Sequence, residues 1–349
     1  MYFSSDNWAG AHPKIADSLV LHAGGYDAAY GDGALDRKVQ QRFSEIFERE
    51  VSVFFVGTGT AANSLSLALY ARPGGIAFCH NGAHVAEDEC GAPEFFSGGT
   101  RLKLVEGGQG KFSAETLDRA VSRYFPTVVH DGRATAVTIT QATETGTVYS
   151  LDEVSAISAV TKKHGLGLHM DGARFANALV SLDTTPAEMT WRRGVDVVSF
   201  GGTKNGCWCA EAVLLFDPAK AEELAFLRKR GAQLFSKSRF IAAQFDAYLA
   251  DDLWLANARH ANAMAAALAD GFRASRHARL AWEPQANEVF AVIEKGSAER
   301  ARSAGARFYD WHVPAGFEGP IAANEGLYRF VTSFATTADD VAKFIELIG

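Results

Sequence analysis

The sequence is poor in cysteine, and this scarcity excludes several kinds of protein. Its 349 residues include four cysteines, Cys79, Cys90, Cys207 and Cys209. Four cysteines in a chain of this length are too few for a disulfide scaffold. One residue separates Cys207 from Cys209, whereas about two to four separate paired zinc ligands. We therefore expect reduced thiols, no metal site and a cytoplasmic location.

A basic surplus and a long apolar run are also missing. The 34 Lys and Arg residues face 41 Asp and Glu residues, which gives a net charge of -7 and argues against binding to nucleic acid. The longest uncharged stretch, 51–71, is interrupted by Gly-Thr-Gly-Thr at 57–60. This pattern is typical of a strand, a turn and a helix, and not of a membrane span. Asp6 stands where the apolar run of a signal peptide would begin. We predict no nucleic-acid partner and no membrane partner.

What the chain does contain is enough apolar material for a large core, since hydrophobic residues make up 48% of it. Through the first two thirds, short apolar segments alternate with helical patterns, and Ser150 with Glu153 forms a capping box before a helix at 151–164. This alternation predicts an α/β fold with a mostly parallel sheet. The expected strands lie at 51–56, 76–78, 101–105, 136–140, 166–170, 195–200 and 212–216.

The sequence pattern changes after Pro218. Two long Ala-rich helical patterns follow, at 219–249 and 254–273, and then shorter strand-like segments. At about 150 residues a domain, the length allows two domains. We predict an N-terminal arm and large domain over 1–245, and a smaller C-terminal α/β domain over 246–349. The expected strands of the smaller domain lie at 289–293, 307–312 and 327–333, and a last helix begins at Thr337.

Two charged residues each follow an apolar strand pattern. Lys204 comes after Val-Asp-Val-Val-Ser-Phe-Gly-Gly-Thr, and Asp171 after Gly-Leu-Gly-Leu-His-Met. A lysine just past a buried strand is partly desolvated, which frees its amine for Schiff-base chemistry. An aspartate at a neighbouring strand end can keep a pyridine nitrogen protonated. Together they indicate pyridoxal 5'-phosphate (PLP). The alternatives are an exposed turn lysine and an aspartate that caps the next helix.

The Gly-Thr-Gly-Thr turn at 57–60 is a candidate phosphate site. A turn between a strand and a helix directs backbone N–H groups and the helix N-terminus toward one point. Thr58 and Thr60 can add hydroxyl donors. The turn lacks the lysine of a Walker A motif and the spacing of a dinucleotide site, which disfavours a nicotinamide-dependent oxidoreductase. An ordinary strand–helix turn is the alternative.

Three further side chains are candidates. His84 follows the strand expected at 76–78, where an imidazole could stack on a cofactor and move a proton; it could equally be a surface or core histidine. Arg174 could grip a carboxylate or phosphate with its planar fork, or pair with Asp171. Arg329 alternates with apolar neighbours, so it points either into a cleft between domains or toward solvent.

In their order along the chain, these pieces resemble the low-specificity L-threonine aldolase family, of the aspartate-aminotransferase-like fold (fold type I). The resemblance spans the whole chain. It implies PLP-dependent retro-aldol cleavage of L-threonine, L-allo-threonine and related β-hydroxy-α-amino acids, such as phenylserine, to glycine and an aldehyde. It is carried by Phe-Ser-Ser-Asp-Asn at 3–7, His12-Pro13, Tyr-Gly-Asp-Gly at 30–33, Gly-Thr-Gly-Thr-Ala-Ala-Asn at 57–63, Ala83-His84 with Glu89, His-Met-Asp-Gly-Ala-Arg at 169–174, Lys204 and Arg329.

The resemblance also implies roles for individual residues. Lys204 would bind PLP covalently, Asp171 would hold the pyridine nitrogen and His84 would stack on the ring. A homotetramer built from dimers that share active sites is implied as well. The other cofactor contacts would be Thr58, Gly59, Thr60, Arg174 and Thr203, and the substrate carboxylate would be held by Ser5, Arg174 and Arg329.

The chain departs from the family pattern at two places. Where many members have Glu-Asn-Thr-His, it has Gln-Ala-Thr-Glu at 141–144, so Glu144 stands in place of a second active-site histidine. His84 is therefore the first candidate for the base at the β-hydroxyl, and Glu144 the second. The lysine lies in Gly-Gly-Thr-Lys-Asn-Gly, not in the commoner Ser-Lys-Gly-Leu-Gly. The alternatives are a β-eliminating lyase or aminotransferase of the same fold and, outside enzymes, a regulator or scaffold.

Overall fold

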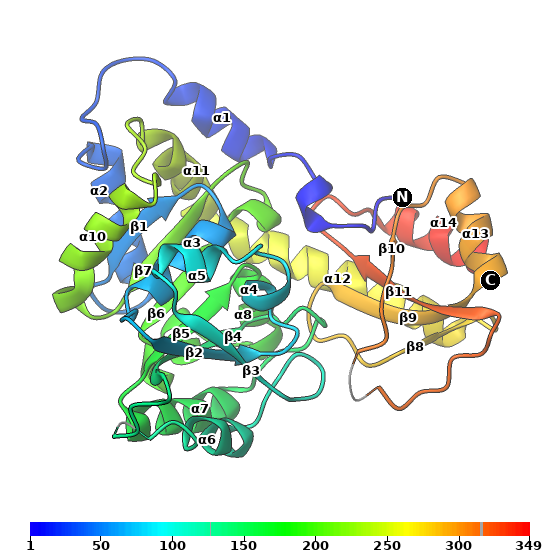
Figure 1. Ribbon diagram of the computed structural model, residues 1–349. Helices are drawn as coiled ribbons and strands as arrows, with labels where there is room; N and C mark the ends of the chain where they lie inside the picture. Colours follow the sequence, from blue (N-terminus) through cyan, green and yellow to red (C-terminus); the bar gives the residue numbers. More distant parts are fainter. Residues whose placement is uncertain (126, 315–316) are drawn as a thin grey trace.

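Two β-sheets and the helix between them organise the chain. The computed structural model describes residues 1–125, 127–314 and 317–349. A seven-stranded sheet with the order β1-β7-β6-β5-β4-β2-β3 occupies the first part of the sequence, and a four-stranded sheet with the order β10-β11-β9-β8 occupies the last part. Helix α12 (Leu253–Ala274) runs from one sheet to the other (Figure 1).

The large sheet is mostly parallel. Only β7 runs against its neighbours, because it is antiparallel to both β1 and β6. The α/β class predicted from the alternating pattern is confirmed, and each expected strand is present with ends shifted by a few residues. The strands are β1 (Ser52–Val56), β2 (Gly75–His80), β3 (Arg101–Val105), β4 (Arg133–Thr140), β5 (Gly167–Gly172), β6 (Val197–Gly201) and β7 (Glu211–Leu215).

Helices cover both faces of this sheet because alternate strand residues point to opposite sides. In β1, Val53 and Phe55 pack in the core that includes α2 and α7, whereas Phe54 and Val56 pack against α3 and α10. The helices of this part are α1 (Pro13–Leu21), α2 (Ala34–Ile46), α3 (Gly59–Ala68), α4 (His84–Glu87), α5 (Ala92–Phe96), α6 (Ala114–Val121), α7 (Leu151–His164), α8 (Phe175–Leu182), α9 (Pro186–Met189), α10 (Ala221–Arg230) and α11 (Arg239–Leu249).

Helix α7 begins and ends where the sequence predicted. The Ser150 hydroxyl accepts the N–H of Glu153 at 3.2 Å, and the Glu153 carboxylate accepts the N–H of Ser150 at 2.7 Å. Gly165 ends the helix in the left-handed region, at φ 67°. The capping box is a local signal, which is why the sequence alone located it, and the left-handed glycine is an equally local one that ends the helix.

The single helix expected at 219–249 is wrong, because α10 and α11 are separate helices. Gly231 ends α10, and Ala232 follows in the left-handed region at φ 58°. The connection then turns back over the large sheet, where the Gln233 side chain accepts the N–H of Gly57 at 3.0 Å. An Ala-rich pattern favours a helix but carries no information about such a long-range contact.

The C-terminal sheet and three helices, one of them α12, form a second core. The strand expected at 307–312 is shorter in the structure: it is β10 (Tyr309–Asp310), because only these two residues pair with β11. Phe3 of the N-terminal arm belongs to this core: its ring lies 5.4 Å from that of Phe344, so the arm packs with the later part of the chain. The domain limits 1–245 and 246–349 stay a prediction. The elements are β8 (Ala278–Leu280), β9 (Glu288–Glu294), α13 (Lys295–Ser303), β10 (Tyr309–Asp310), β11 (Glu325–Val331) and α14 (Ala338–Ile348).

Candidate active site

The turns that follow the parallel strands meet at one edge of the large sheet, as expected for a ligand site in such a fold. They surround a cavity of about 280 Å³. The predicted residues Thr58, Gly59, Thr60, His84, Asp171, Thr203 and Lys204 all line it, together with Asn7, Gly57, Asn63, Ala173 and Glu211.

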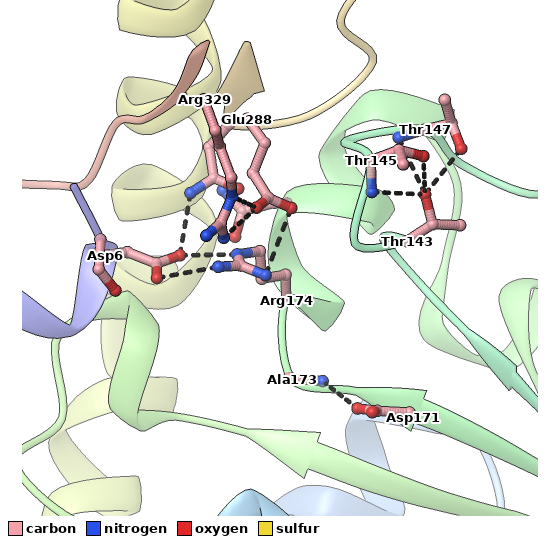
Figure 2. Close-up of polar contacts among 12 residues, drawn as sticks. Asp6, Thr143, Thr145, Thr147, Asp171, Ala173, Arg174, Glu288 and Arg329 are labelled. Atoms are coloured by element: carbon pink, nitrogen blue, oxygen red, sulfur yellow. Dashed lines mark hydrogen bonds and ion pairs between the residues drawn. The ribbon is translucent and has the colours of Figure 1, made fainter. Parts of the chain in front are cut away.

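Asp171 lies near the end of β5, and its carboxylate has two fixed partners. One oxygen accepts the N–H of Ala173 at 3.0 Å (Figure 2), and the other accepts the amide of Asn63 at 2.9 Å. The side chain thus holds the local turn, as the capping interpretation proposed, and faces the cavity as well. The capping and cofactor interpretations are compatible.

The His84 imidazole is oriented by a buried carboxylate. Its Nδ1 lies 2.9 Å from Oε1 of Glu89, and the same oxygen accepts the Asn63 amide at 2.8 Å. Asn63 therefore joins Glu89 to Asp171. The hydrogen bond from Glu89 raises the pKa of His84 above its ordinary value, although burial acts in the opposite direction. A histidine held in this way can take or give a proton near neutral pH.

The turn at 57–60 presents the N-terminus of α3 to the cavity. Thr58 caps the helix, since its hydroxyl oxygen accepts the N–H of Ala61 at 3.1 Å. The N–H groups of Gly59 and Thr60 belong to the first helical turn, which has no partners within its own helix. An anion is favoured at such a point, both by these donors and by the helix dipole.

Lys204 lies in a short 3₁₀ turn, Thr203–Asn205, that follows β6. Asn205 anchors this turn, because its buried amide donates to the hydroxyl of Tyr248 at 2.7 Å and to the carbonyl of Trp254 at 2.8 Å. Gly206 ends it at φ 117°, a conformation that favours glycine. The surroundings therefore fix the backbone of the lysine while its side chain lines the cavity.

Arg174 does not pair with Asp171, contrary to one of the two interpretations of the sequence. It lies beside the cavity in a buried chain of charges (Figure 2). Its Nε and Nη2 donate to Asp6 at 2.7 and 3.1 Å, and its Nη1 lies 3.3 Å from Glu288. Glu288 also accepts Nε of Arg329 at 2.9 Å. The two arginines predicted to hold a carboxylate are therefore neighbours, and each already has an acidic partner.

Ser5 is next to this chain of charges. Its hydroxyl accepts the N–H of Asn7 at 3.1 Å and caps the turn that presents Asp6 to Arg174. The turn over Asp6–Trp8 is thus held locally by Ser5 and at long range by Arg174.

Glu144 is placed by a loop stiffened through hydroxyl groups. The Thr143 hydroxyl lies 2.7 Å from that of Thr147 and 3.1 Å from that of Thr145 (Figure 2). Gln141, the first residue of the altered motif, bonds with its side chain to both backbone groups of Tyr149. The loop therefore has little freedom, and Glu144 is held where a second histidine was expected.

The Glu144 carboxylate faces several cations. Burial opposes its ionisation, but Lys204, Arg174 and His84 together lower its pKa below the ordinary value. It lines a neighbouring cavity of about 440 Å³, which also includes Trp311. Glu144 is therefore an ionised carboxylate beside the Lys204 cavity, and the same cations make it a weak base.

Sequence reasoning missed five residues of this region. Asn63, Asp6 and Glu89 lay inside quoted motifs without a role. Glu211 opens the apolar strand β7, and Glu288 opens β9. A charged residue at the start of an apolar strand was the signal that could have revealed both. Within the described residues, no group of three or more His, Cys, Asp or Glu side chains could hold a metal ion.

The donor set fits a small phosphorylated pyridine. One cavity holds an anion site at a helix N-terminus, a carboxylate already oriented by two hydrogen bonds, an amine and an imidazole. Fold and site together define an enzyme of the fold type I PLP-dependent class.

Comparison with known proteins makes the class more specific. The profile of the family described as beta-eliminating lyase matches residues 3–295. The low specificity L-threonine aldolase of Pseudomonas aeruginosa is 41% identical over 99% of this chain and 97% of its own length. That of a Pseudomonas species is 41% identical over 88% of each chain. The solved threonine aldolase of Leishmania major is 29% identical, with a TM-score of 0.91, over 99% of this chain and 98% of that one. The chain belongs to the beta-eliminating lyase family, among the low specificity L-threonine aldolases.

Two chain-wide findings complete the comparison with the sequence. In the portion that the structure covers, none of the helices has the length and apolar character needed to cross a bilayer. The four cysteines carry free thiols, as predicted.

Proposed function

We propose that this chain cleaves β-hydroxy-α-amino acids, such as L-threonine, L-allo-threonine and phenylserine, into glycine and an aldehyde, with PLP bound at Lys204. The observation that carries the proposal is that Lys204 and Asp171 line one cavity with the N-terminus of α3. The identity of 41% between this chain and two low specificity L-threonine aldolases supports the same reaction.

Each part of the cofactor has a candidate partner. Lys204 holds PLP covalently, Asp171 keeps the pyridine nitrogen protonated and His84 stacks on the ring. Backbone N–H groups of Gly59 and Thr60 hold the phosphate, and Thr58, Thr203 and Arg174 complete the predicted contacts. When bound, PLP supplies the electron sink that lets the bond between Cα and Cβ break.

The substrate carboxylate is assigned to Arg174, Arg329 and Ser5. Arg174 follows β5 of the large sheet, whereas Arg329 lies on β11 of the small one, and Glu288 contacts both guanidinium groups. A carboxylate gripped at this point fixes the rotation about the bond to Cα. That rotation decides which bond of Cα is aligned for cleavage, so binding is converted into choice of reaction.

The proton of the β-hydroxyl goes to His84, at the start of α4, or to Glu144, in the loop after β4; the charge of Lys204 acts on both. Glu144 is already in its basic, ionised form, but the neighbouring cations lower its pKa and so weaken it as a base. His84 must first be neutral, and Glu89 opposes this by favouring the charged imidazole. His84 is the first candidate and Glu144 the second.

β-Elimination is the second candidate function, and the description of the matched family favours it. It would release ammonia and a 2-oxo acid in place of glycine and an aldehyde. An aminotransferase of the same fold would need an amine acceptor. Product analysis separates the three reactions.

We also propose a homotetramer. Large apolar side chains are exposed on several elements, among them Leu21 at 78%, Phe95 at 79% and Phe226 at 65%, and such side chains mark protein contacts when they gather into patches. Light scattering on the purified chain would give the mass of the assembly. The cytoplasmic location stays a prediction.

The test uses the purified protein with PLP and each of the three substrates. Glycine and the aldehyde should appear in equal amounts. Lys204→Ala should abolish both products, and borohydride should no longer fix the cofactor to the chain, as mass spectrometry would show. Lys343→Ala, at an exposed position of α14, is the matched control and should change neither. An unchanged rate in Lys204→Ala would refute the proposal.

A further inference from the structure

Glu211 lies between the two turns of the site. It is the first residue of β7, and its register partners are Val56 on one side and Gly201 on the other. Val56 leads into the turn at 57–60, and Gly201 leads into the turn that carries Lys204. The Glu211 side chain lines the cavity together with both turns. The Glu211 carboxyl group therefore lines the same cavity as the turn at 57–60, to which the phosphate is assigned.

The surroundings of Glu211 offer little to a negative charge. The residue is 6% exposed, and its Oε1 accepts one hydrogen bond, from the N–H of Thr203, at a long 3.4 Å. Among the described residues no ion pair includes it. The nearby Thr203 side chain and Lys204 favour its charged form, whereas Asp171 opposes it. The other titratable groups that face it are Cys207, Cys209 and Tyr248, which burial keeps neutral by raising the pKa of each.

A phosphate in the neighbouring turn would conflict with a charged Glu211. Near neutral pH a phosphate ester carries a charge of about -1.5 to -2, and two anions in a poorly hydrated cavity repel each other strongly. A neutral carboxylic acid, in contrast, has an O–H group that can donate to a phosphate oxygen. The protonation state of Glu211 therefore decides whether it opposes or supports the anion.

We propose that Glu211 is a positioning residue that is protonated when the cofactor phosphate occupies the turn at 57–60, and that loss of this proton weakens binding of the phosphate. Where Glu211 is ionised in the free protein, binding of the phosphate then draws a proton from solvent onto its carboxylate. The inference rests on the proposed function, because the phosphate is that of PLP.

The direction of the pH dependence follows from linkage. Burial raises the pKa of Glu211 to about 7, and a bound phosphate raises it further. The affinity for PLP is therefore highest below that pH and falls as the pH rises through it, because Glu211 must take up a proton before the phosphate binds. Pyridoxal has no phosphate, so its affinity should not show this loss with rising pH.

The experiment measures retention of PLP by the full-length protein in equilibrium dialysis, from about pH 6 to about pH 9. Wild type, Glu211→Gln and the exposed control Glu346→Gln are compared, and pyridoxal is run beside PLP. Glutamine keeps the size and a donor N–H but cannot ionise. Wild type and Glu346→Gln should lose about tenfold more affinity for PLP over this range than Glu211→Gln, a coupling of ordinary size.

Calorimetry of the wild-type protein provides a second readout that needs no variant. Titrations near pH 8 in buffers of different ionisation enthalpy count the protons taken up. Since a tenfold coupling raises the pKa of Glu211 by about one unit, PLP should take up roughly 0.4 of a proton more than pyridoxal at this pH.

The outcomes are separable. Parallel PLP curves for wild type and Glu211→Gln, or equal proton uptake for PLP and pyridoxal, would overturn the role of Glu211 and leave the proposed function standing. If the wild-type protein retains PLP at no pH, the proposed function falls and the inference falls with it.

Discussion

Asp6 and Arg174 form a buried two-point ion pair that ties the N-terminal arm to the edge of the active-site cavity. The distances are 2.7 Å from Nε to Oδ2 and 3.1 Å from Nη2 to Oδ1 (Figure 2). Burial opposes ionisation of Asp6, but Arg174 and Lys204 lower its pKa below the ordinary value. Because neighbouring Phe3 packs in the second core, the arm connects that core with the active site.

Replacing Asp6→Asn should destabilise the protein and impair binding of the substrate carboxylate. Removal of one partner leaves a buried guanidinium with less charge compensation, which costs about 3 kcal/mol in such pairs. We expect a lower urea midpoint and a raised KM. Asp17→Asn, at an exposed position of α1, is the control. An unchanged midpoint together with an unchanged KM would show that the pair has neither role.

Replacing Glu89→Gln should move the acid limb of the activity profile to lower pH. The Glu89 carboxylate raises the pKa of His84, so its neutralisation lowers that pKa, and the neutral imidazole needed as a base persists to lower pH. The measurement is kcat/KM against pH for wild type and variant. A limb that stays in place would show that His84 does not control it.

The two candidate bases can be compared directly. Loss of a general base costs about 10²- to 10⁴-fold in rate. If His84 is the base, His84→Asn should fall in that range and Glu144→Gln should lose clearly less kcat, with circular dichroism confirming that both variants fold. The reverse order would move the base to Glu144.

His169 should make the fold sensitive to acid. It lies on β5, with Nδ1 2.8 Å from the Thr138 hydroxyl and Nε2 2.9 Å from the Ser199 hydroxyl. Burial lowers its pKa to about 3, from an ordinary value of 6.5. The neutral ring is compatible with the fold, so stability is complete above pH 6.5 and is lost as the pH falls toward 3. Protonation of this histidine alone should lower the free energy of unfolding by about 1.4 kcal/mol for each pH unit in that window.

Urea unfolding between about pH 4 and pH 7 tests this. The free energy of unfolding of His169→Asn should depend less steeply on pH than that of wild type. The exposed control His130→Asn should keep the wild-type slope. Equal slopes for wild type and His169→Asn would contradict the assignment.

Much of the site could be predicted because its signals are local. Lys204 and Asp171 stand at strand ends, and the carboxyl ends of parallel strands meet at one edge of a sheet, so their convergence follows from the α/β pattern. The start of α7 followed from a capping box. In each case the residues that carry the information are within a few positions of one another.

The remaining features depend on contacts between distant segments. The antiparallel register of β7 puts Glu211 between two turns that are far apart in sequence. The partners of Arg174 come from the N-terminal arm and from β9, and Gln233 reaches Gly57 only because the chain leaves α10. The sequence by itself determined the chemistry of the groups at the strand ends. Only the tertiary structure decided which buried charges they face, because strand register and domain packing bring those charges together.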